Sequence, residues 1–186
     1  MATNLITKAI TVGSIGQVSV AKFGREFELL VPFSSQISDE AGANLIKSIN
    51  LNQSSSNVNK GLSSAVDYLL STRTAKSSSD SQSNELVFVI SDGKNLNSVK
   101  LNESLVKAHQ EKIIVLLIII DAAVQSIESV VVPRFSPTTS ELLCLQPYME
   151  TLPFDFYIIL KDVKNLPRVL SSTIHEWVDL FHKGNQ

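Results

Sequence analysis

The sequence predicts a layered α/β domain with a mostly parallel β-sheet. Three short apolar runs, Leu86–Ser91, Lys112–Ile120 and Phe154–Leu160, lack the alternation of a strand with one wet face. Such runs are typical of strands buried on both faces of a parallel sheet. Stretches with apolar residues at helical spacing lie between them, as the crossover connections of a parallel sheet require. The combination favours helices packed on both sides of one sheet.

The N-terminal third predicts two helices that flank a β-hairpin. Apolar residues at helical spacing indicate a helix over Asn4–Val12, which ends before two glycines. Gln17–Phe23 and Glu26–Pro32 are separated by a Gly-Arg turn and predict the hairpin, the one antiparallel pairing we expect. A second helix should run from Ser38 to about Ile49, with Ser38 as its N-cap.

The remainder supplies the helices and loops between the buried strands. Helices are expected over Val58–Thr72, Asn97–Gln110 and Pro167–His182, the last opening on a proline that needs no helical N–H. The Ser-rich segment Ala75–Asn84 predicts a surface loop. Two prolines in Ala122–Ser140 predict an irregular segment that is ordered but exposed.

Composition excludes several classes of protein. At 186 residues the chain suits one domain, and a net charge of −2 with a pI near 5.9 disfavours non-specific nucleic-acid binding. The longest apolar run, Ile113–Ile120, is far too short to span a membrane, and no signal peptide is evident at the N-terminus. The single cysteine, Cys144, permits no internal disulfide, and we expect it to be a small buried apolar residue.

Motifs for catalysis are not found. The sequence contains no Gly-rich phosphate loop and no Gly-x-Ser-x-Gly nucleophile elbow. Its three histidines fall on predicted helix surfaces without a carboxylate partner, which makes a poor metal site: His109, His175 and His182. We therefore expect no enzymatic activity.

A Ser-Asp-Gly turn, residues 91–93, follows the first buried strand. The ligand sites of open α/β sheets lie just beyond the carboxyl ends of the strands, and Asp92 stands at that point. Its carboxylate either binds a cation or caps the following helix. Ser56, in a loop before a helix, offers a hydroxyl to the same edge of the sheet. Together these oxygens supply part of a Mg²⁺ shell, and further ligands must come from elsewhere.

The C-terminal sequence closely resembles the last domain of the midasin family. The resemblance rests on the run from Pro147 to Tyr157, followed by Leu-Pro at 166–167 and Glu-Trp at 176–177. Matches at Val20–Gly24, Pro32-Phe33, Ser38-Asp39 with Gly42, Val89–Gly93, Ser126-Ile127 and Val132-Pro133 extend it over nearly the whole chain. Midasins are giant AAA-type ATPases of large ribosomal subunit assembly. Their last domain has a von Willebrand factor A fold with a metal-ion-dependent adhesion site.

The resemblance implies which residues hold the metal. In that family, three loops provide the ligands, and Asp92 matches the carboxylate of the third loop. Ser56 falls where the second loop has a threonine. The Asp-x-Ser-x-Ser first loop and its central strand precede the family region that residue 1 matches. We therefore expect one N-terminally incomplete domain over residues 1–186, with weakened Mg²⁺ binding unless another carboxylate, such as Asp121, substitutes.

The implied function is protein binding. A midasin-like module would dock a ubiquitin-like domain of a ribosome assembly factor on pre-60S particles, through a Mg²⁺-dependent site rimmed by Ser91, Gly93 and Asn95. It would work in the nucleus, in the nucleolus or nucleoplasm, without contacting nucleic acid or membrane directly. The alternative is a degenerate or truncated fragment without metal-dependent binding. An enzyme of unrecognised type is a third reading. No ATPase module lies in this chain.

Overall fold

The computed structural model describes residues 17–33, 57–75, 85–94, 96, 98–122 and 125–184. The expected helices over Asn4–Val12 and Ser38–Ile49 and most of the Ser-rich loop lie outside these residues, as do Ser56 and Asn95. The chain divides into two compact units, one of residues 57–161 and one that joins residues 1–56 to 162–186.

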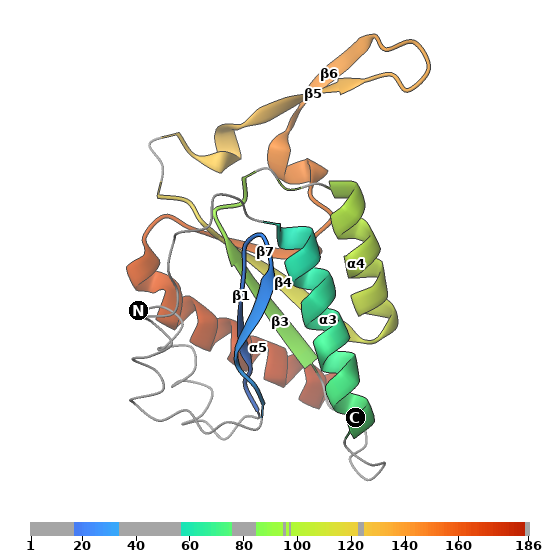
Figure 1. Cartoon of the computed structure of the whole chain (residues 1–186). Helices are drawn as coiled ribbons and strands as arrows, with labels where there is room; N and C mark the ends of the chain where they lie inside the picture. Colours follow the sequence, from blue (N-terminus) through green and yellow to red (C-terminus); the bar gives the residue numbers. More distant parts are fainter. Residues whose placement is uncertain are drawn as a thin grey trace. The chain divides into compact units, whose positions relative to one another are not determined.

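A three-stranded parallel sheet forms the centre of the 57–161 unit (Figure 1). Its order is β3 (Glu85–Ser91), β4 (Ile113–Ile120) and β7 (Phe156–Leu160), with β4 in the middle. Strand β4 is the most buried, and its Leu117, Ile118 and Ile119 have no exposed surface. The three apolar runs therefore form the three parallel strands that the sequence predicts, with β7 beginning two residues later than expected.

Helices α3 (Val58–Ala75) and α4 (Ser98–Gln110) lie side by side on this sheet, where α3 contacts β3 and α4 contacts β4 (Figure 1). Leu62, Val66 and Leu69 bury one face of α3 at the helical spacing seen in the sequence. Near the end of α3, Arg73 makes two 2.8 Å bonds to the carboxylate of Glu85 on β3. It also reaches the Glu111 carbonyl at 2.9 Å, so one guanidinium joins α3, β3 and the turn before β4.

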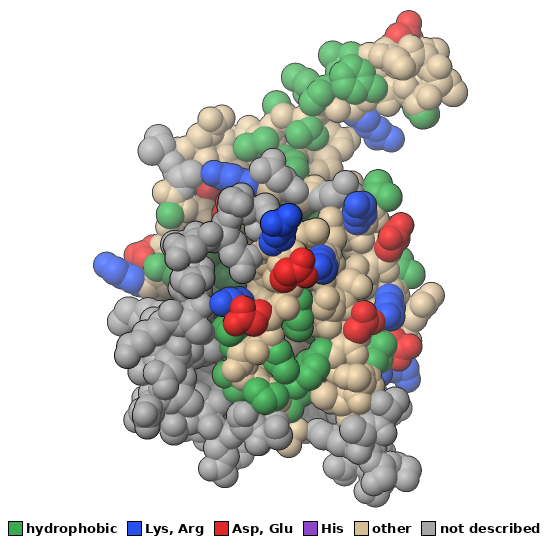
Figure 2. Space-filling model, in the orientation of Figure 1, with side chains coloured by type: hydrophobic (Ala, Val, Ile, Leu, Met, Phe, Trp, Pro, Cys, Tyr) green, Lys and Arg blue, Asp and Glu red, His purple; other side chains and the backbone are tan. Residues whose placement is uncertain are grey.

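A second antiparallel hairpin corrects the expectation that only one exists. Strands β5 (Val131–Phe135) and β6 (Leu142–Pro147) pair with each other and extend away from the three-stranded sheet (Figure 1). Directly paired residues share a face, so one face carries only apolar side chains: Val131, Pro133, Phe135, Leu142, Leu145 and Pro147. Its Val, Phe and Leu members are each more than half exposed and gather along the hairpin in Figure 2. The expected excursion over 122–140 thus holds an ordered strand and a 3₁₀ turn, η1 (Ile127–Ser129).

Cys144 on β6 is exposed, so the expectation of a buried cysteine is wrong. A two-stranded ribbon that projects from its domain has no second layer to cover either face. The side chain of Cys144 therefore stays in solvent opposite Arg134, its partner on β5.

The other unit contains the predicted first hairpin and the last helix. Strands β1 (Val20–Phe23) and β2 (Phe27–Val31) pair antiparallel across a short turn. After the 3₁₀ turn η3 (Val163–Asn165), α5 (Leu166–Gly184) buries Leu166, Leu170 and Ile174, which recur every four residues. Both elements follow the sequence prediction.

Strands β1 and β3 each have one hydrogen-bonded strand partner within the described residues. Among the described residues, β1 is hydrogen-bonded only to β2, and β3 only to β4. No helix in the described part of the chain has the length and apolar character to cross a membrane.

Candidate functional site

The turn after β3 presents an exposed carboxylate at the carboxyl end of the sheet. The side chain of Asp92 is exposed, and its Oδ1 accepts a 3.1 Å bond from the backbone N–H of Lys94. Ser91 Oγ, half-buried, accepts the N–H of Gly93 at 3.2 Å. Both side chains therefore shape the turn that the sequence predicts, and Asp92 does so while its carboxylate faces solvent.

Gly93 is required at this turn for two independent reasons. Its φ of +73° lies in the left-handed region that side chains with a Cβ rarely adopt. A Cβ built there would lie 2.7 Å from Ile127 Cδ1 and 3.1 Å from Ile119 Cγ2. The backbone of the turn is therefore packed directly onto η1 and β4, and Gly93 itself is buried beneath the exposed Asp92.

Tyr148 holds the turn from a third direction. Its hydroxyl donates to the Gly93 carbonyl at 2.9 Å and accepts the N–H of Leu96 at 3.1 Å. Tyr148 opens the 3₁₀ turn η2 (Tyr148–Thr151), immediately after β6 ends. Its own N–H donates to the Val130 carbonyl, and its carbonyl accepts the hydroxyl of Thr151. The sequence resemblance includes Tyr148 but gives it no role, because its partners lie more than fifty positions earlier in the chain.

A second carboxylate, Asp121, ends the neighbouring strand β4 in a different environment. It is 6% exposed, and one of its oxygens accepts bonds from Lys161 Nζ (2.7 Å), Ser126 Oγ (2.7 Å) and the N–H of Ile127 (3.2 Å). Lys161 also pairs with Glu128 at 2.7 Å and contacts the Ser126 hydroxyl. The Lys161 ammonium, and next the Ser126 hydroxyl, hold the pKa of Asp121 below its ordinary value. The carboxylates of Asp121 and Glu128 in turn raise the pKa of Lys161.

This environment makes Asp121 a poor ligand for a metal cation. An ammonium at 2.7 Å occupies the position from which a cation would approach, and two like charges there repel each other. Asp121 instead accepts the N–H of Ile127 and so holds Ile127 where it packs against Gly93. Sequence reasoning found Asp121 at the end of its strand but had no signal that Lys161, forty positions later, would pair with it.

The two remaining predicted site residues, Ser56 and Asn95, lie outside the described residues. Asn57, which follows Ser56, accepts the N–H of Lys60 on its side-chain oxygen and so caps helix α3. Within the described ranges, no group of three or more His, Cys, Asp or Glu side chains is arranged to hold a metal. The bonds that the structure shows at this turn join Asp92 to the N–H of Lys94 and the Ser91 hydroxyl to the N–H of Gly93.

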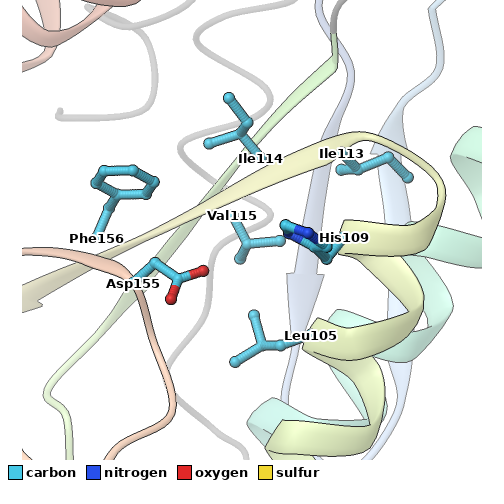
Figure 3. A pocket seen from close by; sticks show the side chains of 7 residues that line it. All are labelled: Leu105, His109, Ile113, Ile114, Val115, Asp155 and Phe156. Atoms are coloured by element: carbon cyan, nitrogen blue, oxygen red, sulfur yellow. The ribbon is translucent and has the colours of Figure 1, made fainter.

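A shallow pocket of about 70 Å³ lies at the opposite, amino-terminal end of β4 and β7 (Figure 3). His109 from α4 and Asp155, just before β7, line the pocket together with five apolar side chains: Leu105, Ile113, Ile114, Val115 and Phe156. His109 is exposed, as the sequence predicts. The pocket is small and remote from the Asp92 turn, so it takes no part in the candidate site.

The described geometry is that of a von Willebrand factor A domain, and comparison with known families agrees. The family model "von Willebrand factor type A domain" matches residues 3–129, so the chain belongs to this family. Its predicted fold class is thereby confirmed.

Among curated proteins, the chain is similar to midasins. It is 27% identical over 180 residues to "Midasin" of Dictyostelium discoideum and 30% identical over 180 residues to "Midasin" of Giardia intestinalis. Each match covers 96% of this chain, but only 3% and 4% of those relatives. The resemblance found in the sequence is confirmed, and the chain corresponds to a small part of those proteins' length.

Solved structures show the same fold at low sequence identity. Proximal thread matrix protein 1 from the mussel byssus matches with a TM-score of 0.61 and 15% identity, over 93% of this chain and 40% of that one. A form of that protein with a zinc-occupied MIDAS motif matches with a TM-score of 0.57 and 14% identity, over 92% of this chain and 42% of that one. An aerotolerance-related membrane protein from Bacteroides fragilis gives 0.53 and 12%, over 94% and 87% of the two chains.

Proposed function

We propose that this chain is a midasin-type protein-binding module of large ribosomal subunit assembly. In this proposal, residues 1–186 form one von Willebrand factor A domain that docks a ubiquitin-like domain of an assembly factor on the pre-60S particle in the nucleus. The role is binding and not catalysis. The observation that carries the proposal is the Ser91–Gly93 turn, which fixes a buried backbone beneath an exposed carboxylate at the carboxyl end of β3.

The donor chemistry of this turn fits a hard divalent cation such as Mg²⁺. Asp92 offers a solvent-facing carboxylate, and such cations prefer oxygen ligands of which one or two are carboxylates. In the proposal Asp92 holds the cation, Ser56 is a second ligand, and Ser91, Gly93 and Asn95 form the rim. When bound, Mg²⁺ would supply the positive charge that a partner's carboxylate needs to approach Asp92.

The competing function is a fold without metal-dependent binding. It is favoured by the finding that, among the described residues, no three His, Cys, Asp or Glu side chains are arranged to hold a metal. Both functions share the fold and differ in one measurable property, the requirement of partner binding for a divalent cation.

The test is a pull-down of a recombinant ubiquitin-like domain of a ribosome assembly factor, with Mg²⁺ and with chelator. We expect binding to the native chain in Mg²⁺, and its loss in chelator and in Asp92→Ala. The matched control is Asp155→Ala, an exposed carboxylate at the other end of the sheet, which should bind like the native chain. Because Asp92 is exposed, its replacement should leave the melting temperature nearly unchanged. Binding that is equal in chelator and in Mg²⁺ would exclude the metal-dependent mechanism.

A further inference from the structure

The segment that follows Asp92 is held by a side chain from a distant part of the chain. Gly93 and Leu96 are three residues apart, and one hydroxyl bonds the carbonyl of the first and the N–H of the second. A phenolic O–H both donates and accepts, so Tyr148 satisfies two backbone groups at once. This bridge joins the last residue of the turn to Leu96, two positions before α4 begins at Ser98.

The hydroxyl can position the turn because Tyr148 is itself fixed. Its N–H donates to Val130 at 2.8 Å and its carbonyl accepts Thr151 Oγ1 at 2.7 Å, so its backbone is bonded on both sides. The next residue, Met149, is buried. The phenol therefore extends from an anchored backbone to the turn and does not merely rest on its surface.

The turn is also confined by buried side chains that pack against Gly93. Ile127 and Ile119 are both buried and pack against Gly93, whereas the Tyr148 hydroxyl bonds its carbonyl. Residues 26, 34 and 55 positions later in the sequence thus converge on one glycine. Asp92, next to that glycine, keeps an exposed side chain on a constrained backbone.

We propose that Tyr148 is a positioning residue: its hydroxyl holds the Gly93 carbonyl and the Leu96 N–H in the arrangement that presents the Asp92 carboxylate. This inference rests on the proposed function for its consequence, because a positioned carboxylate matters only if a cation or partner meets it. The positioning itself is a property of the backbone and is measured without either.

The test compares Tyr148→Phe with Tyr157→Phe in the full chain. The first substitution removes the bridging hydroxyl and keeps the ring. The second removes the hydroxyl of a tyrosine that is 48% exposed on β7. Amide hydrogen exchange, resolved by NMR, reports on the Leu96 N–H, and denaturant melts report on global stability. Mn²⁺ serves as a paramagnetic probe of cation binding beside Asp92.

In Tyr148→Phe we expect the Leu96 amide to exchange roughly three- to tenfold faster, as the loss of one net hydrogen bond predicts. Amides in the centre of β4 should exchange at their native rates, and the Mn²⁺ concentration that half-broadens the resonances around Asp92 should rise about fivefold. Tyr157→Phe should match the native chain in every measurement.

Two results would overturn the positioning role. One is a Leu96 exchange rate within twofold of the native rate. The other is acceleration that is equal at Leu96 and throughout β4, which would make Tyr148 a contributor to global stability alone. If Leu96 opens selectively but Mn²⁺ broadens nothing near Asp92 in the native chain, the positioning role stands and the metal-dependent function fails.

Discussion

Gly93→Ala tests whether the turn beneath Asp92 is as tightly constrained as its geometry implies. Placing a residue with a Cβ at a φ of +73° costs about 1–2 kcal/mol. The new methyl also meets Ile119, which has no exposed surface, at 3.1 and 3.2 Å, and overpacking a buried site costs about 1–3 kcal/mol. We therefore expect the free energy of unfolding, measured by urea denaturation, to fall by about 3 kcal/mol. A loss below about 0.5 kcal/mol, the scale of an ordinary surface substitution, would refute this reasoning.

A second substitution identifies the clash. Ile127→Val deletes Cδ1, the atom that would lie 2.7 Å from the new methyl. Alone, Ile127→Val should cost about 0.5–1.5 kcal/mol through the lost methyl group. Combined with Gly93→Ala it should cost less than that, or restore stability, because the contact it removes is then repulsive. Strict additivity in this double-mutant cycle would show that the turn shifts away from η1 instead of pressing on it.

Three further predictions concern the surroundings of the site. The pKa of Asp121 in the folded chain is below its ordinary value. The stabilisation that its carboxylate provides is therefore present above about pH 4 and is lost as the pH falls through the folded pKa. In denaturant melts, the Asp121→Asn variant should lose less stability over that acid range than the native chain. Arg73→Met should lower the free energy of unfolding by about 1.5–3 kcal/mol in the same assay, because it leaves Glu85 without its two-bond partner, and a native-like midpoint would contradict this. Phe135→Ser on the exposed hairpin should change stability by no more than about 0.5 kcal/mol, whereas a larger loss would mean that the hairpin packs against the domain.

The parallel strands were predictable because their signal is local. An uninterrupted apolar run such as the one ending at Ile120 has few folded outcomes other than a doubly buried strand. The Ser-Asp-Gly turn was predictable for the same reason, since Gly93 and its neighbours carry their own turn chemistry.

The β5–β6 hairpin was not predictable from such signals. Pro133 and Pro137 favour irregular structure, and the apolar residues of Leu142–Pro147 suggest a buried segment, yet the strand is exposed. An apolar strand is buried only where another helix or sheet covers it, and the periodicity of the sequence does not show whether such a covering element exists. Cys144 was misplaced for this reason. Tyr148 and Lys161 were missed because their bonds connect positions 40 to 55 residues apart.

The two carboxylates at the ends of β3 and β4 differ in exposure and in bonding. These strands pair in parallel, so Asp92 and Asp121 both lie at the carboxyl end of the sheet. Asp121 is buried and already has an ammonium, a hydroxyl and an amide as partners, and moving it would cost those bonds. Asp92 is exposed, while its backbone is fixed by Gly93 and Tyr148. A group that is solvent-facing yet already positioned loses little conformational entropy on binding, which lowers the cost of association. The bonds of Asp121 hold Ile127 where it packs against Gly93, and Asp92 remains the exposed carboxylate.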